Sequence, residues 1–173
     1  MSHSRSVDGG IDEIPLPVMS GRLWLCGKHV VAPDPESALA RVAATTIVCL
    51  TRKHEIEDRY PGYVDWLHAH APGRAIWIPT PDLAIHPLDK MRPHLDDMVS
   101  RLHDGQRLII HCAAGIGRSG TTAVALLMLL GENREDALKT VADHRPMGGP
   151  EVGAQRTFIE ELELTLSQGS KFG

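Results

Sequence analysis

The chain has 173 residues, a formal net charge of −4 and 42% hydrophobic residues, which fits a single soluble domain with one core. The acidic balance argues against a general nucleic-acid binder. The longest uninterrupted apolar stretch, residues 123–130, is too short to cross a bilayer, so we expect no membrane insertion.

Short patterns near the N-terminus and the cysteine count bear on organisation and location. Residues 1–20 contain acidic side chains and no apolar block, which predicts no secretory signal. Their Ser- and Gly-rich composition predicts a disordered N-terminal segment over 1–20. Three cysteines without paired spacing favour a reducing compartment, so we expect a cytoplasmic protein.

The remaining elements alternate between strand and helix patterns. Short apolar segments predict strands at 23–26, 46–50, 75–78 and 108–111. Helical patterns cover 34–43, a segment starting near 89 or 90, 118–130, 134–144 and 151–167. This alternation predicts an α/β fold: one domain with a mainly parallel central sheet of about four to five strands and helices on both faces.

The most informative stretch follows the last predicted strand. Cys112 ends that strand, Arg118 lies six residues later, and Gly115 and Gly117 lie in the loop that leads into the next helix. Backbone N–H groups of 113–118 can converge on one point, next to the positive end of the helix. The same field favours a nucleophilic Cys112 thiolate. The pattern predicts a site for a tetrahedral dianion with a nucleophile at its floor.

Other side chains of this loop have predicted roles as well. The planar fork of Arg118 suits two phosphate oxygens. We expect the Ser119 hydroxyl to donate a hydrogen bond to the sulfur when it becomes a leaving group, and the His111 ring to bind and orient the loop backbone. The predicted substrate-binding residues are Ala113, Ala114, Gly115, Ile116, Gly117 and Arg118.

The stretch from His111 to Gly120, His-Cys-x5-Arg-Ser-Gly, resembles the signature loop of the cysteine-based protein tyrosine and dual-specificity phosphatases. The resemblance runs from about Gly21 to Leu166. It looks closest to small atypical dual-specificity phosphatases of the kinase-associated, cyclin-dependent-kinase-inhibitor type. It implies a phosphatase catalytic domain over 21–168 and a tail over 169–173.

The resemblance also indicates an acid and a helper residue. Asp82 lies 30 residues before Cys112, where small members carry the general acid that protonates the leaving oxygen. Asp89 is the other candidate, but its position is more typical of a helix N-cap. Gln155 matches a glutamine that helps position the hydrolytic water in some relatives. It is equally well explained as an ordinary polar helix residue.

One cysteine has a possible redox role. Several relatives carry a cysteine near the end of the second strand that traps the oxidised nucleophile as a disulfide. Cys49 is the candidate here, provided that its side chain shares a sheet face with Cys112. A shift of one residue would turn Cys49 to the other face, and a small buried core residue is the alternative interpretation.

The expected function is hydrolysis of phosphotyrosine, and also of phosphoserine or phosphothreonine, in phosphorylated protein substrates through a cysteinyl-phosphate. We expect no cofactor and no metal, because no histidine pair has a ligand spacing. Phosphoinositide or RNA-end hydrolysis is less favoured, because Ala113, Ala114 and Ile116 are not basic. A phosphate-binding module without turnover is the third possibility.

Overall fold

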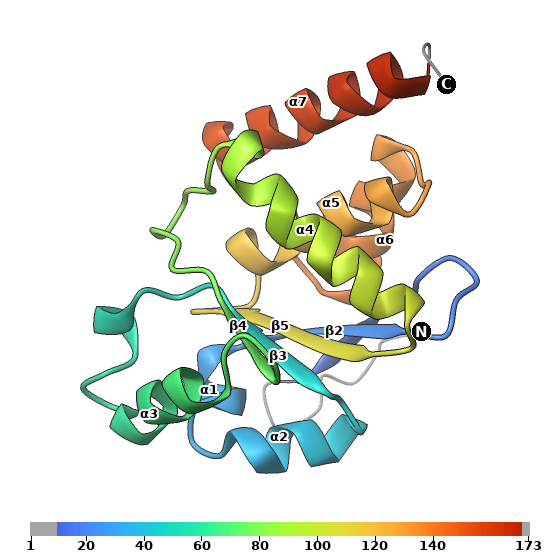
Figure 1. The fold of residues 1–173 in the computed structure, drawn as a ribbon. Coiled ribbons are helices and arrows are strands. Elements are labelled where there is room, and N and C mark those ends of the chain that lie inside the picture. Colours follow the sequence, from blue (N-terminus) through green and yellow to red (C-terminus); the bar gives the residue numbers. More distant parts are fainter. Residues whose placement is uncertain (1–9, 171–173) are drawn as a thin grey trace.

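A five-stranded sheet forms the centre of the protein (Figure 1). The structure, a computed structural model, describes residues 10–170. The strand order is β1-β2-β5-β3-β4; β1 pairs antiparallel with β2, and the other pairs are parallel. The strands are β1 (Asp12–Ile14), β2 (Arg22–Gly27), β3 (Thr46–Cys49), β4 (Ala75–Trp77) and β5 (Arg107–Cys112). The predicted α/β class, with a mainly parallel sheet, is confirmed.

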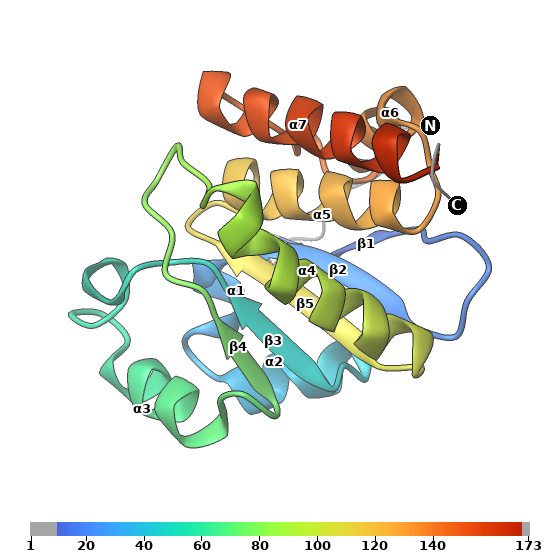
Figure 2. The ribbon, with the colours of Figure 1, turned by 45° about the horizontal axis from the view of Figure 1, so that its top comes forward.

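Helices cover both faces of the sheet, as Figures 1 and 2 show. One face carries α1 (Lys28–Val31), α2 (Pro35–Val42) and α3 (Pro61–His70), with the 3₁₀ turn η1 (Lys53–Glu55) before α3. The other face carries α4 (Leu88–His103), α5 (Gly117–Leu129), α6 (Arg134–His144) and α7 (Gly153–Ser170). The β-α alternation of the sequence therefore produces two separate helical layers.

Local capping explains where several helices start. The Asp34 carboxylate accepts a hydrogen bond from Ser37 N at 3.0 Å, and this fixes the first turn of α2. Asn133 caps α6 in the same way. In α4 the N-cap is Pro87, and Asp89 lies in the first turn. The cap position expected for Asp89 was therefore wrong by two residues, because the helix already starts at Leu88.

The two helical layers enclose two apolar clusters, and β5 contributes to both. Leu108, Ile110 and Cys112 belong to the cluster under α4–α7, whereas Ile109 belongs to the cluster under α1–α3. Successive side chains of a strand point to opposite faces, so this division follows from the period of two. Because β5 is paired on both sides, its carboxyl end lies in the middle of the sheet edge.

The N-terminal segment differs from its prediction. Residues 12–14, which were expected to be disordered with the rest of 1–20, form β1 and pair with Leu23–Leu25 of β2. Two of the three residues of β1 are acidic, and the strand forms because it pairs with an edge of β2 that would otherwise be unpaired. Residues 1–9 lie outside the described residues.

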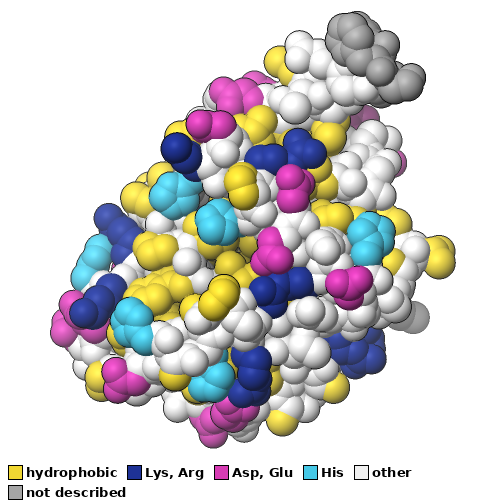
Figure 3. All heavy atoms as spheres, viewed as in Figure 1, with side chains coloured by type: hydrophobic (Ala, Val, Ile, Leu, Met, Phe, Trp, Pro, Cys, Tyr) yellow, Lys and Arg dark blue, Asp and Glu magenta, His cyan; other side chains and the backbone are white. Residues whose placement is uncertain are grey.

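The surface carries no obvious single-sign field on the face shown in Figure 3, where acidic, basic and histidine side chains are interspersed. Of the helices within residues 10–170, none is both long enough and apolar enough to span a bilayer.

Candidate active site

The loop after β5 requires glycine at its turning point. Gly115 has φ +73°, a left-handed conformation that favours glycine. A β-carbon on Gly115 would also stand 2.4 Å from the backbone of Cys26 on the neighbouring strand. The loop can therefore curl tightly between Cys112, which is buried, and the start of α5.

Four successive carbonyl groups of this loop are held from outside. The carbonyls of residues 113–116 each accept a hydrogen bond from a donor elsewhere in the chain or in α5. The pairs are Lys28 N to Ala113 O (3.1 Å), Arg145 Nη2 to Ala114 O (2.9 Å), Arg145 Nε to Gly115 O (3.1 Å), and Gly149 N and Gly120 N to Ile116 O (3.1 and 2.9 Å). Carbonyls fixed on the outside leave the amide groups turned to the inside, which is the arrangement that an anion needs.

Arg145 is the main external support of the loop. Besides its two bonds to the loop, its Nη1 donates to Asp12 Oδ2 at 2.8 Å and to Gly10 O at 3.1 Å. The guanidinium thus joins β1 to the loop after β5. The sequence analysis missed Arg145, because a residue 30 positions after the loop shows no local sign of this contact.

Arg118 is buried, and its orientation is fixed by three hydrogen bonds. Nη1 and Nη2 donate to the two Glu55 oxygens at 2.9 and 2.8 Å, and Nη1 also donates to Thr80 O at 2.8 Å. Its Nε is buried and has no partner among the described residues. A buried donor without a partner is costly, and an oxyanion in the loop would satisfy it.

Glu55 is the second residue of the candidate site that the sequence analysis missed. It lies in η1, after β3, and its carboxylate also accepts from Arg52 N at 2.8 Å. Burial raises the pKa of Glu55, but the hydrogen bonds from Arg118 and Arg52 N and the charges of both arginines outweigh it and lower the pKa to about 2. The sequence did contain one signal for Glu55: it follows β3 by six residues, and β3 lies next to β5 in the sheet.

The structure brings Asp82 to the site. Its Oδ1 lies 3.7 Å from Arg118 Nη2 and accepts a hydrogen bond from Leu83 N at 2.9 Å. The carboxylate is 65% exposed, which leaves it accessible to a substrate. Leu83, next to it, has φ +61° and is half exposed.

Gln155 is buried and connects two loops. Its Oε1 accepts from Glu151 N at 2.8 Å, and its Nε2 donates to Ala84 O at 3.3 Å, two residues after Asp82. It therefore ties the loop of the candidate acid to the start of α7. Its contribution to positioning water stays a prediction.

His111 contacts the backbone of Cys112, and its role in orienting the loop stays a prediction. Its Nδ1 lies 3.2 Å from Cys112 O, and its Nε2 lies 2.6 Å from the Tyr63 hydroxyl. Burial lowers the pKa of His111 to about 4, so the ring is neutral near pH 7. A neutral ring satisfies both contacts if Nδ1–H donates to Cys112 O and Nε2 accepts from Tyr63.

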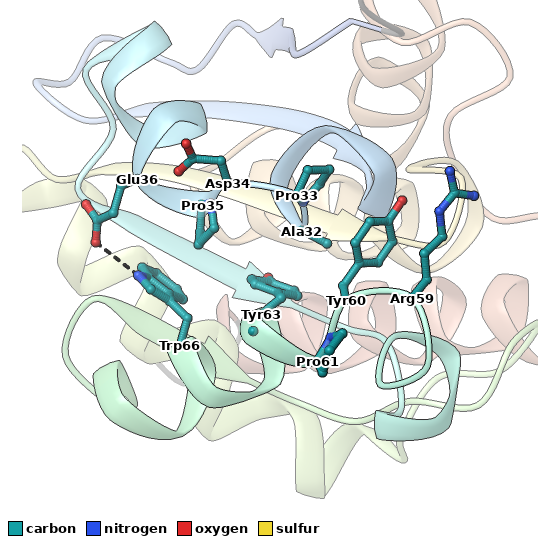
Figure 4. Close-up of a pocket in the computed structure, with 11 residues that line it drawn as sticks. Ala32, Pro33, Asp34, Pro35, Glu36, Arg59, Tyr60, Pro61, Tyr63 and Trp66 are labelled. Carbon is teal, nitrogen blue, oxygen red and sulfur yellow. Dashed lines mark hydrogen bonds between the residues drawn. The ribbon is translucent and has the colours of Figure 1, made fainter.

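Tyr63 also lines a pocket of about 610 Å³ between the α1–α2 connection and α3. Figure 4 shows Tyr60, Tyr63 and Trp66 around it, with Glu36 accepting a hydrogen bond from Trp66 Nε1. No residue of the signature loop lines this pocket.

The remaining predicted residues have different outcomes. Ser119 is fully buried, and its Oγ has no hydrogen-bond partner among the described residues, so it is free to bind a ligand or the sulfur.

Within residues 10–170 no group of three or more His, Cys, Asp or Glu side chains is arranged so that it could hold a metal ion.

Cys49 does not share a sheet face with Cys112, so the condition for a disulfide is not met, and the alternative interpretation, a small buried core residue, fits the structure. Cys49 is paired in register with His111, the residue before Cys112, and directly aligned residues of neighbouring strands share a face. Cys49 and Cys26 lie in the cluster under α1–α3, whereas Cys112 lies in the cluster under α4–α7. The Cys49 sulfur lies 3.1 Å from Thr51 Oγ1, and burial raises its pKa to about 11.

The fold and the loop together define a class of protein. In this class a sheet has helices on both faces, and a cysteine and an arginine lie at the two ends of the loop that follows the central strand. A family model described as "Swiss Army Knife protein, DSP-PTPase phosphatase domain" matches residues 19–158. The chain belongs to this dual-specificity phosphatase family, as the signature motif predicted.

Individual relatives agree with this assignment. Human dual specificity protein phosphatase 22 is 33% identical over 79 residues, which is 43% of this chain and 43% of that protein. Human dual specificity protein phosphatase 8 is 36% identical over 84 residues, 45% of this chain and 13% of that protein. The chain thus matches less than half the length of these relatives.

Solved structures show the same fold over almost the whole chain. Kinase-associated phosphatase, solved with its catalytic-site cysteine replaced by serine, superposes with a TM-score of 0.75 at 19% identity and covers 94% of this chain and 98% of its own. Tk-PTP in its active form gives a TM-score of 0.62 at 25% identity, and the match covers 95% of this chain and 99% of the Tk-PTP chain. The predicted similarity to the kinase-associated type is confirmed at the level of the fold.

Proposed function

We propose that this protein hydrolyses phosphotyrosine, and also phosphoserine or phosphothreonine, in phosphorylated proteins of the cytoplasm, with Cys112 as the nucleophile. The observation that carries the proposal is the loop itself. The outward carbonyls of 113–116 leave inward amides, and the fork of Arg118 is held beside them by Glu55. This geometry suits three non-bridging phosphate oxygens above a cysteine.

In the first step the Cys112 thiolate attacks phosphorus, and the bond from phosphorus to the side-chain oxygen breaks. The loop amides and Arg118 bind the charge that builds up on the phosphoryl oxygens. Asp82 gives its proton to the leaving oxygen, because a free alkoxide or phenolate is a poor leaving group. The products are a cysteinyl-phosphate and the dephosphorylated side chain.

In the second step water attacks the cysteinyl-phosphate, and Asp82, now ionised, takes its proton. The phosphorus–sulfur bond breaks, and the thiolate returns with inorganic phosphate released. The unpartnered Ser119 hydroxyl donates to the departing sulfur. Gln155 supports both steps by holding the loop of Asp82 through Ala84.

The test is turnover of p-nitrophenyl phosphate and of a phosphotyrosyl peptide. Cys112→Ser should abolish turnover and still bind vanadate, because a serine hydroxyl in this loop does not ionise. Arg118→Lys should lower the rate by roughly 10²–10³, because the lysine loses the two-point grip on the oxygens. Wild-type rates in either variant would contradict the mechanism. A wild-type protein that binds vanadate without turnover would be the phosphate-binding module instead.

The acid is tested by the leaving group. Asp82→Ala should lower kcat by roughly 10²–10⁴ for a phosphotyrosyl peptide and much less for p-nitrophenyl phosphate, whose product needs little protonation. Asp89→Ala is the matched control. If Asp89→Ala shows this dependence and Asp82→Ala does not, the acid is Asp89.

A further inference from the structure

A second exposed carboxylate lies against the phosphate-binding loop. Glu151, in the connection between α6 and α7, has its Oε2 2.4 Å from the point where a β-carbon on Gly117 would stand. Gly117 is the last loop residue before Arg118 and the first residue of α5. The Glu151 side chain thus occupies the space beside the loop that the missing side chain of Gly117 leaves open.

The backbone of Glu151 is held in place. Its N–H donates to Oε1 of the buried Gln155 at 2.8 Å. The segment before it is anchored by Gly149 N, which donates to Ile116 O at 3.1 Å. These two bonds hold the backbone of this segment beside the loop.

The cations of the candidate site have partners of their own, and none of them forms an ion pair with Glu151. Arg118 is paired with Glu55, Arg145 with Asp12, and Lys28 Nζ donates to Glu55 O at 2.9 Å. Arg52, 40% exposed, lies 3.7 Å from Glu55. Across residues 10–170 no ion pair involves Glu151.

The variable positions of the loop add no charge of their own, because they are Ala113, Ala114 and Ile116. Two exposed carboxylates therefore lie beside the loop: Asp82 next to Arg118, and Glu151 next to Gly117. A substrate with a second anionic group beside its phosphate is repelled there, and one with a cation is attracted.

We propose that Glu151 determines substrate specificity: it selects phosphorylated side chains flanked by Lys or Arg and disfavours substrates with a second phosphate or carboxylate next to the scissile one. This inference rests on the proposed function and narrows its substrate class. Repulsion of the scissile phosphate itself is common to all substrates, so it cancels in a comparison between them.

The experiment compares two phosphotyrosyl peptides of equal length, one with Arg and one with Glu on both sides of the phosphotyrosine. In the wild-type protein kcat/KM should favour the Arg peptide by roughly tenfold at low salt. Glu151→Gln should reduce this preference roughly three- to fivefold, and about 0.5 M NaCl should shrink the preference of the wild-type protein. Glu160→Gln, the same charge change on an exposed residue of α7, should keep the wild-type preference.

The outcomes are separable. An unchanged preference in Glu151→Gln, with both peptides still hydrolysed, overturns the role of Glu151 and leaves the proposed function standing. An equal gain for both peptides also overturns it, because the carboxylate would then oppose only the scissile phosphate. No turnover of either peptide or of p-nitrophenyl phosphate by the wild-type protein overturns the proposed function and this inference with it.

Discussion

Glu55 and Arg118 lie 63 residues apart and form an ion pair with two hydrogen bonds of 2.8 and 2.9 Å. Side-chain exposure is 2% for Arg118 and 13% for Glu55, so water screens the pair little. The pair uses both Nη atoms and leaves Nε without a partner. Glu55 therefore decides which donors of the guanidinium stay available for a ligand.

Replacing Glu55 by Gln should show this dependence. The amide keeps the size of the side chain but accepts at one atom only, so the fork of Arg118 loses its fixed orientation. We expect kcat/KM for p-nitrophenyl phosphate to fall roughly 10–100-fold. Glu57→Gln, which removes an exposed partner of Lys53, is the control and should stay within about twofold. If Glu55→Gln and Glu57→Gln had equal rates, the orientation of Arg118 would not depend on Glu55.

The pH dependence of stability should report on His111. Burial lowers the pKa of His111 to about 4 from an ordinary value of 6.5. Between these values the unfolded chain binds a proton that the folded protein does not, so this contribution is complete above pH 6.5 and is lost as the pH falls towards 4. It amounts to about 3 kcal/mol.

Urea unfolding of the wild-type protein and of His111→Asn between pH 7 and 4.5 measures this effect. The slope of stability against pH should be smaller in the variant, whatever its absolute stability. His144→Asn, an exposed histidine, should keep the wild-type slope. Parallel slopes in the wild-type protein and His111→Asn would show that His111 titrates normally.

Two glycines with positive φ separate backbone strain from steric conflict. Gly115 has φ +73° and Gly131 has φ +107°, so Ala costs about 1 kcal/mol at each through strain. Only at Gly115 would the new β-carbon meet backbone atoms, because nothing lies within 4 Å at Gly131. Gly115→Ala should lose both thermal stability and turnover, and Gly131→Ala only a few degrees in Tm. Full activity in Gly115→Ala would contradict the loop geometry.

Arg145 should matter for the phosphate site without touching the phosphate. Arg145→Lys cannot make both bonds to Ala114 O and Gly115 O, so the loop amides lose their fixed direction. We expect kcat/KM to fall at least roughly tenfold, vanadate affinity to fall in parallel, and stability to drop by about 1–3 kcal/mol. Asp12→Asn, which keeps the bonds to the loop, should have a smaller effect on turnover. If Asp12→Asn lowered turnover more than Arg145→Lys, the loop would be supported mainly by β1 rather than by the bonds from Arg145.

Oxidation should leave Cys49 and Cys112 unlinked. Cys49 faces the α1–α3 layer, and burial raises the pKa of Cys49 to about 11 and that of Cys26 to about 12, so neither forms a reactive thiolate near neutral pH. Peptide mapping after mild peroxide should find oxidised Cys112 without a disulfide, and Cys49→Ser should be inactivated at the wild-type rate. A Cys49–Cys112 crosslink would require a different strand register.

Local patterns predicted much of the architecture. The apolar segments at 23–26, 46–50, 75–78 and 108–111 became four strands with boundaries shifted by at most one residue. Helix 134–144 was predicted at its observed bounds, and in the structure Asn133 caps its first turn. The signature loop could be predicted for the same reason: its nucleophile, glycines and arginine lie within ten consecutive residues, and their spacing carries the chemistry.

The supports of that loop could not be found this way. Glu55, Arg145 and Asp12 come from distant segments, and each acts only because the parallel sheet brings strand ends and connections to one edge. The sheet face of Cys49 depended on the pairing register of β3 with β5, and a shift of one residue in that register would turn the side chain to the other face. By itself the sequence determined the class of fold and the candidate reacting groups, because both are encoded in short periodic or contiguous patterns. Only the tertiary structure decided which charges pair, which donors stay free and which carboxylates border the site, because these are contacts between residues far apart in the chain.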